Sequence, residues 1–327
     1  MSTRPPIRQL VAEQIEPGHA VLGSGRPLHY TVLPDPRDGL PGHIRAASAI
    51  RRRGSRLIVV QDDVNALALL DPGGGIEPLL LPAGPGGRRT FEEASGTKRL
   101  KMDLEACVLL PDQRLIAFGS GSSPRREHVV VLSPESVARV LPAGALFAEL
   151  RRWTDAMGVE LNVEGAVLQG ERLRLLQRGN GRHSGIRQDA GSAVLDLSLD
   201  DFLAWLQGTG ATPAVTGIVR VDLGAKGGVP LGFTDATITA DGRLAFLCCA
   251  EDSADVRSDG PVLGCCFGWL DEDRARMTDV VGSDGRPTRQ KLEGIESRPG
   301  QPDVFDVVAD MDRPEEPSWL YELRVSG

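Results

Sequence analysis

The segment EACVLLPDQRLIAFGS (residues 105–120) contains two short apolar runs on either side of the polar turn Pro111-Asp112-Gln113. Proline and aspartate favour tight turns, and apolar runs of this length are typical of the two strands of a β-hairpin. Glu105 opens the first run, and the small residues Gly119 and Ser120 end the second. The segment therefore predicts an antiparallel strand pair whose polar ends lie at one edge.

The same plan recurs along the chain. The opening positions of its five copies are Ser48, Glu105, Glu164, Asp235 and Glu293. The other copies have their turns at Gly54-Ser55, Gly170-Glu171, Asp241-Gly242 and Pro299-Gly300. A third apolar run follows in every copy, at Ala66–Leu70, His128–Leu132, Ala193–Leu197, Val262–Leu270 and Trp319–Val325. Fourth strands are expected at Ile76–Leu81, Val137–Leu141, Gly217–Leu223 and, more weakly, Arg276–Val281.

Units of four strands, repeated without long helices, are typical of a β-propeller. We expect an all-β fold with a single domain over residues 1–327, and a propeller of five blades, with six as the alternative. The last unit has three clear strands, so we expect Leu28–Leu33 to supply its fourth strand and close the ring. Residues 1–25 are expected to form a partly ordered arm. Short helices are expected at Ala145–Met157 and Ser198–Gln207.

Composition excludes several classes of protein and partner. The chain has 37 basic and 45 acidic residues, a formal charge of −8, which disfavours a nucleic-acid or anionic-membrane partner. No apolar run is long enough to cross a membrane, and residues 1–10 contain no apolar segment typical of a secretory signal. The five cysteines lack disulfide-framework spacing. We therefore expect a cytoplasmic protein.

The polar ends of the strand pairs are expected to meet at one mouth of the central channel. Four of the five opening residues are acidic: Glu105, Glu164, Asp235 and Glu293. The second strands end in polar groups: Asp62 and Asp63; Ser120 and Ser122 with Arg125 and Arg126; Gln177, Arg178 and Asn180; Glu251 and Asp252; and Asp310 and Asp312. Any one of these residues alone is more simply a solvated turn or strand cap.

Crowded carboxylates repel one another, and either a hard cation or neighbouring basic residues would relieve that repulsion. Oxygen-rich clusters suit Ca²⁺ or another divalent cation, and Glu105, Glu164, Asp235 and Glu293 are the expected ligands. Lys101, Arg178 and Lys291 are close enough in sequence to neutralise the acids instead.

The segment Gly119–Arg126 is the second candidate site. Its small residues can expose backbone N–H groups to an anion, and Arg125 and Arg126 can bind phosphate or carboxylate. The alternative is a flexible loop. His183 is a candidate general base near the mouth, although a solvated loop histidine is the simpler interpretation. The pairs Cys248-Cys249 and Cys265-Cys266 are expected to be buried hydrophobic residues rather than metal ligands, because neighbours on a strand point to opposite faces.

Six stretches resemble a bacterial family of unknown function, DUF6929. They are Asp103–Ala106, Phe118–Ser123 with Arg125 or Arg126, Leu161–Ala166, Gln177–Asn180, Thr234–Thr237 and Lys291–Ile295. More distantly, the repeated Glu-Gly after an apolar residue is similar to esterase-like phytase and gluconolactonase-type propellers. That resemblance implies a channel mouth whose acids hold a divalent metal, commonly Ca²⁺, and assist hydrolysis.

Two functions from different classes follow. The first is a metal-assisted hydrolase of a small ester, lactone or phosphoester. In it, Glu105, Glu164, Asp235 and Glu293 position the cation, and one carboxylate or His183 activates water. Its substrate would be held by Arg125, Arg126 and Arg178 with the other tip residues Asp62, Asp63, Ser120, Ser122 and Asn180. The second is a non-catalytic propeller, a sensor or scaffold, that binds a small molecule or peptide at the same mouth. The sequence does not specify an oligomeric state.

Overall fold

The computed structural model describes residues 5–16, 19–179, 191–253 and 260–326. Most of its strands form five antiparallel groups in which consecutive strands pair. The first group is β4 (Ala47–Arg53), β5 (Arg56–Gln61), β6 (Ala66–Leu70) and β7 (Ile76–Leu80). The second is β8 (Leu104–Leu109), β9 (Leu115–Gly119), β10 (His128–Leu132) and β11 (Ala138–Pro142). The third is β12 (Val163–Gln169), β13 (Arg172–Gln177), β14 (Ala193–Ser198) and β15 (Val215–Asp222).

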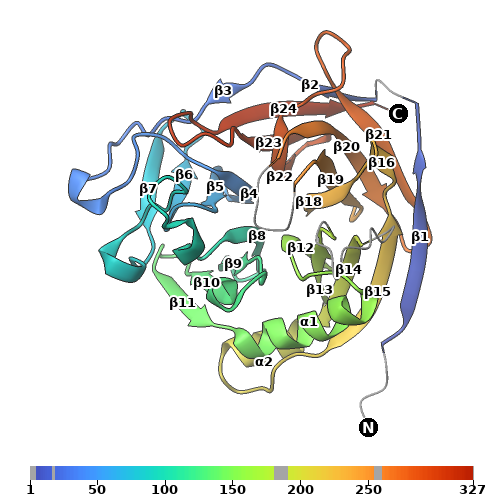
Figure 1. The fold of residues 1–327 in the computed structure, drawn as a ribbon, viewed down its shortest axis with the longest axis horizontal. Coiled ribbons are helices and arrows are strands. Elements are labelled where there is room, and N and C mark those ends of the chain that lie inside the picture. Colours follow the sequence, from blue (N-terminus) through green and yellow to red (C-terminus); the bar gives the residue numbers. More distant parts are fainter. Residues whose placement is uncertain (1–4, 17–18, 180–190, 254–259, 327) are drawn as a thin grey trace.

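The later groups follow the same order. The fourth is β18 (Gly232–Ile238), β19 (Leu244–Glu251), β20 (Val262–Leu270) and β21 (Ala275–Gly282), and the fifth begins with β22 (Lys291–Arg298), β23 (Gln301–Asp310) and β24 (Trp319–Val325). The small hairpin β16 (Ala225–Lys226) and β17 (Val229–Pro230) lies between the third and fourth groups. In Figure 1 the first strand of each group lies nearest the centre and the later strands lie farther out. The fold is therefore all-β and propeller-like.

The first strands of the five groups contact one another in the cyclic order β4, β8, β12, β18, β22 and back to β4. Apolar side chains fill the spaces between neighbouring groups. In β19, for example, Phe246 and Cys248 pack toward the third group, whereas Leu247 and Cys249 pack toward the fifth. Alternate residues of a strand point to opposite faces, so one strand contributes to two cores.

The N-terminal segment runs along the outer edge of three groups. β1 (Ile7–Gln14) pairs in parallel with β15 and then with β21, and β2 (Ala20–Leu22) pairs with β21 on one side and β24 on the other. β3 (Arg26–Pro27) continues along β24. The strand expected at Leu28–Leu33 is therefore wrong, because the strands that pair with β24 are β2 and β3. Leu28 is buried beside the first group, whereas Leu33 is exposed, and the segment forms no strand: its one β-bridge within the described residues is His29–His43.

The third and fourth strands expected from the sequence are confirmed within one or two residues of their ends. Both expected helices are also present: α1 (Gly144–Met157) packs its apolar face on the second and third groups, and α2 (Leu199–Leu206) follows β14. Ser198 caps α2 by accepting a hydrogen bond from the N–H of Asp201. Neither helix, the only two α-helices among the described residues, has the length and apolar character needed to cross a membrane.

The cysteines of β19 and β20 lie directly opposite one another. Cys248 faces Cys266 on one side of the sheet and Cys249 faces Cys265 on the other. Cys248 and Cys266 are buried thiols, as expected, but Cys249 and Cys265 form a disulfide. The expectation of four buried thiols is wrong for that second pair, because the register brings its two sulfurs face to face on the same side of the sheet.

A buried arginine fills the centre of the ring. Arg51 of β4 donates to both carboxylate oxygens of Asp235 in β18, each over 2.9 Å. The same guanidinium donates to the backbone carbonyls of Ala166 in β12 and Ile295 in β22. Both charged side chains are almost completely buried. One ion pair thus connects four of the five inner strands.

We expect Asp235→Asn to lower the free energy of unfolding by roughly 3–5 kcal/mol, because it leaves the Arg51 charge buried without its partner. Urea denaturation followed by circular dichroism measures this change. Asp284→Asn, on an exposed turn, is the matched control and should change the free energy by less than about 0.5 kcal/mol. Equal stabilities for the two variants would contradict a central role for the ion pair.

Candidate functional site

Each inner strand begins with a β-bulge, at which one residue has no partner in the ladder. The five bulged residues are Ser48, Glu105, Glu164, Thr234 and Glu293. A bulge redirects a side chain at the end of a strand and is frequent beside functional sites. Ser48 and the three glutamates line a pocket at one end of the ring axis.

Asp235 lies outside this pocket. The bulge in β18 falls on Thr234, so Asp235 sits one residue further into the strand and binds Arg51. A shift of one residue reverses the face to which a side chain points. The alignment of Asp235 with the three glutamates is therefore off by one residue.

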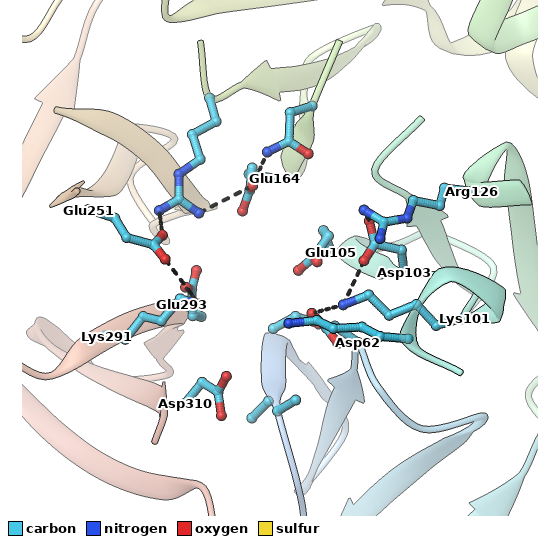
Figure 2. A pocket seen from close by; sticks show the side chains of 16 residues that line it. Asp62, Lys101, Asp103, Glu105, Arg126, Glu164, Glu251, Lys291, Glu293 and Asp310 are labelled. Atoms are coloured by element: carbon cyan, nitrogen blue, oxygen red, sulfur yellow. Dashed lines mark hydrogen bonds and ion pairs between the residues drawn. The ribbon is translucent and has the colours of Figure 1, made fainter. Parts of the chain in front are cut away.

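The axial pocket has a volume of about 40 Å³, and seven acidic and five basic residues line it. The acids are Asp62, Asp103, Glu105, Glu164, Glu251, Glu293 and Asp310, and the bases are Lys98, Lys101, Arg126, Arg178 and Lys291. In Figure 2 the side chains of Glu105, Glu164 and Glu293 lie around the pocket, with Lys101 beside Asp62 and Asp103 and with Lys291 beside Glu293.

Lys101 holds the carboxylates on one side of the pocket. Its Nζ lies 2.7 Å from Asp62, 3.0 Å from Asp63 and 2.8 Å from Asp103. Arg126 forms a second ion pair with Asp103, over 2.8 Å. These two cations outweigh the effect of burial and lower the pKa of Asp103. Lys101 and Arg126 thus offset most, but not all, of the negative charge of Asp62, Asp63 and Asp103.

Arg178 and Lys291 hold the opposite side. Arg178 pairs with Glu164 over 3.3 Å and with Glu251 over 2.5 Å. Lys291 lies 2.8 Å from Asp312 but 3.7 Å from Glu293, whose Oε2 is buried without a hydrogen-bond partner among the described residues. Glu293 is thus only partly neutralised.

The inner acids keep an excess of negative charge. Burial raises the pKa of Glu105 well above its ordinary value, and neighbouring carboxylates, above all Asp62, raise it further. Burial also raises the pKa of Glu293 well above its ordinary value, an effect that Lys291 only partly opposes. The pKa of Glu164 is raised to about 7, because burial outweighs the attraction of Arg178. A cation placed among these carboxylates would favour their ionised form.

One group of carboxylates has the spacing of metal ligands. Oxygens of Asp62, Asp103 and Glu105 lie within 4.8 Å of one another. Lys101 already pairs with the first two, so its ammonium occupies part of this cluster. Glu105 makes no hydrogen bond or ion pair within the described ranges, and it faces the pocket beside Glu164. Glu105 is therefore the acid most available to a cation.

A second hollow, called the outer hollow below, adjoins the axial pocket. Its volume is about 140 Å³, and it shares Ala46, Asp62, Lys98 and Asp310 with the axial pocket. Burial raises the pKa of Asp310 to about 7, against the opposing effect of Lys291. Asp310 thus faces both cavities.

The remaining candidates lie in different places. Asp63 lines the outer hollow, where Lys101 outweighs burial and holds its pKa at about 2. Arg125 is exposed and does not line the pocket, whereas its neighbour Arg126 is buried and does. Asn180 and His183 lie outside the described residues.

The segment expected to bind an anion is already satisfied internally. The N–H of Ser120 donates to the carbonyl of Asp103, and that of Gly121 to the carbonyl of Arg126. The hydroxyl of Ser120 donates to the Asp103 carboxylate, and Ser122 accepts from Arg126 over 3.0 Å. This loop positions Asp103 and Arg126 and presents no free anion-binding nest.

Several lining residues were not among the candidate site residues. Lys98, Asp103 and Asn162 belong to this set, whereas the tip acids Glu251 and Asp310 were expected at the mouth and do line the pocket. Asp103 and Asn162 each stand two residues before a bulged glutamate, and Asn162 donates to Glu164 over 2.6 Å. The repeated polar residue at that position was the available signal.

The chain matches a family of unknown function, DUF6929, over residues 43–325. No curated protein matches it. Solved structures with similar chains include a virginiamycin B lyase from Staphylococcus aureus, at 9% identity and a TM-score of 0.42, covering 93% of this chain and 99% of the other. A gluconolactonase from Xanthomonas campestris is 11% identical with a TM-score of 0.41, covering 95% of this chain and 98% of the other. The calcium-binding protein regucalcin from Agrobacterium tumefaciens is 9% identical with a TM-score of 0.43, covering 94% of this chain and 97% of the other. These scores are too low to transfer an activity or a ligand.

The raised pKa of Asp310 predicts a pH-dependent stability. The folded protein holds this proton up to about pH 7, whereas the ordinary carboxyl loses it near 3.8, so the free energy of unfolding should fall as the pH rises from 4 to 7. In metal-free protein, Asp310→Asn should remove the contribution of this carboxyl to the fall in the free energy of unfolding between pH 4 and 7. That contribution is on the order of 1–3 kcal/mol. Urea denaturation at several pH values measures it. Asp303→Asn, exposed at the far end of β23, should keep the wild-type slope; an unchanged slope in Asp310→Asn would contradict the prediction.

Proposed function

We propose a metal-assisted hydrolytic function for this chain, which belongs to the DUF6929 family of unknown function because the match spans residues 43–325. The substrate class would be a small ester, lactone or phosphoester. The observation that carries the proposal is the axial pocket, in which the buried bulge glutamates Glu164 and Glu293 and the half-buried Glu105 face a small cavity with an excess of negative charge. We also propose that the fold is a single five-bladed propeller, a count supported by the cyclic contacts of the inner strands.

The size of the cavity favours an ion over an organic ligand. A water molecule needs about 10–15 Å³ by a comparable measure. The axial pocket, at about 40 Å³, therefore has room for an ion with very few waters. The outer hollow, at about 140 Å³, is the place for the reacting part of a substrate.

The residues fit a hard divalent cation, with Ca²⁺ the first candidate. Carboxylate oxygens are the ligands that Ca²⁺ prefers, and Glu105, Glu164 and Glu293 would hold it, with Asp62 beside them. The unpaired oxygens Glu293 Oε2 and Asp62 Oδ1 are buried acceptors that a cation would satisfy. When bound, such an ion would polarise the substrate carbonyl or phosphoryl oxygen and stabilise the negative charge that develops on it.

The chain's own residues supply the other parts of such a reaction. Asp310 lines both cavities and is placed to accept a proton from water that enters between them. Arg126 and Arg178 hold their carboxylate partners in place and keep the pocket rigid. Asn162 orients Glu164. The buried ion pairs therefore preorganise the site before any ligand arrives.

The alternative is a non-catalytic propeller that binds a small molecule or peptide through a cationic group. One observation favours it: the ammonium of Lys101 already lies among Asp62, Asp63 and Asp103, so the mouth accepts an amine among its carboxylates. A ligand amine would then replace the metal at the inner glutamates. This function requires binding without turnover.

Metal binding tests the first proposal. Protein stripped with EDTA should bind one Ca²⁺ by isothermal titration, with the stoichiometry checked by elemental analysis. The double variant Glu105→Gln/Glu164→Gln should bind at least 100-fold more weakly, because it removes two charged ligands. Glu135→Gln, an exposed acid outside the pocket, should bind as the wild type does. No binding at millimolar Ca²⁺, Mg²⁺ or Mn²⁺ would overturn the metal and favour the alternative.

Turnover tests the chemistry. In a panel of esters, lactones and phosphoesters, Glu164→Gln and Asp310→Asn should each lower kcat/KM at least 100-fold while the fold stays intact by circular dichroism. Asp303→Asn is the control and should retain activity. Stoichiometric metal binding without turnover of any substrate in the panel would contradict the hydrolase and leave a metal-dependent binding protein.

A further inference from the structure

A groove lined by arginines lies beside the mouth of the pocket. It is formed by the loop before β4, which contains η1 (Pro36–Asp38), and by the loop after β7, which contains η2 (Pro85–Gly87). Its volume is about 470 Å³. This is more than three times the volume of the outer hollow, so the groove can take the body of a small molecule.

The groove is positive on a protein that is negative overall. Four arginines line it, Arg37, Arg45, Arg88 and Arg89, against the two acids Asp38 and Glu92. Arg37 and Arg45 also pair with Asp35 and Asp63, which do not line the groove. The chain as a whole has a formal charge of −8. An anion would therefore find a more favourable local potential here than in the axial pocket, which carries an excess of acids.

Two of these arginines are held in place by the protein. Arg45 is buried and donates to Glu92 over 2.7 Å and to the carbonyl of Phe91 over 3.2 Å. Arg89 donates to the carbonyl of Leu81 over 3.2 Å and lies 3.5 Å from Asp38. A guanidinium that is already ordered loses little entropy when it binds an anion.

Arg88 remains available for a ligand. Its side chain is exposed, and it makes no hydrogen bond or ion pair within the part of the chain that the structure describes. The turn that presents it is closed by the N–H of Gly84 donating to the carbonyl of Arg88 over 2.7 Å. Arginine binds phosphate and carboxylate through two parallel hydrogen bonds, so Arg88 and Arg89 together form a recognition site for such groups.

The groove continues into the proposed site. Arg45 and Pro314 line both the groove and the outer hollow, which in turn shares Asp62 and Asp310 with the axial pocket. A molecule lying in the groove would reach the carboxylates with one end.

We propose that the arginine groove binds a small molecule carrying at least two phosphate or carboxylate groups and that, on the proposed function, it holds the anionic part of the substrate. Phosphate and carboxylate share the relevant chemistry, because each is a compact anion that a guanidinium group binds. Tripolyphosphate and tricarballylate serve as probes of the two sources.

Isothermal titration of metal-free protein with each probe tests the proposal. At least one probe should bind the wild type, and Arg88→Gln/Arg89→Gln should weaken that binding at least tenfold. Arg286→Gln, on an exposed turn that does not line the groove, should bind as the wild type does. If the double variant fails to fold, the single variant Arg88→Glu replaces it. Arg88 is exposed, and this variant should show the same loss of probe binding.

Three outcomes would overturn the groove proposal. Neither probe binds the wild type, or the Arg286→Gln control loses as much probe binding as the double variant does. In the third outcome, probe binding requires Ca²⁺ and disappears in Glu105→Gln. The last outcome would place the anion on the metal. The groove proposal and the metal-assisted hydrolase proposal can fail independently of each other, because anion binding in the groove is measured on metal-free protein. Loss of Ca²⁺ binding or turnover leaves probe binding intact, and a groove that binds no anion leaves Ca²⁺ binding intact.

Discussion

The arrangement of the inner strands depends on one buried guanidinium. Arg51 lies where the strands approach the axis, and it satisfies carbonyl groups of strands that do not pair with one another in any sheet. A buried charge is tolerated only with a partner, and Asp235 supplies it. The same interaction closes the axis below the pocket, so the carboxylates at the mouth face a floor that is already filled.

Above that floor, opposite charges are sorted by distance from the axis. The bulges direct glutamates inward, while the strand tips and loops bring lysines and arginines in behind them. Each basic residue neutralises the acids at its own side, and the inner acids keep part of their negative charge because seven acids face only five bases around the pocket. On the proposed function, this arrangement favours a positive guest in the pocket. The neighbouring arginine groove has the opposite preference, so one end of the molecule can hold both a cation and an anion close together.

Much of this architecture could be predicted from the sequence. Short apolar runs with turn residues between them located the strands, and the third strands in particular match their predicted ranges. Glu105, Glu164 and Glu293 were found because an apolar residue precedes each and a small residue follows. Asp235 was misplaced because a bulge leaves no sequence signal, and Thr234, a neutral residue, occupies its position in β18.

Other features depend on contacts that sequence does not encode locally. The pairing of Lys101 with three acids and the disulfide of Cys249 with Cys265 follow from register across strands. Likewise, β1 was not predicted as a strand because its pairing edges are supplied by residues some two hundred positions later.

The path of β1 also has a consequence for the order in which the protein is made. Its first partner, the segment Ile218–Asp222, leaves the ribosome on the order of 10–40 seconds after Ile7–Val11 at ordinary rates of synthesis. An unpaired strand edge is a template for aggregation during that time. Because β1 is already synthesised, it can cover the edges of β15 and then β21 as each emerges. Ile7–Gln14 is thus synthesised before both strands whose edges it covers, in the third and fourth groups.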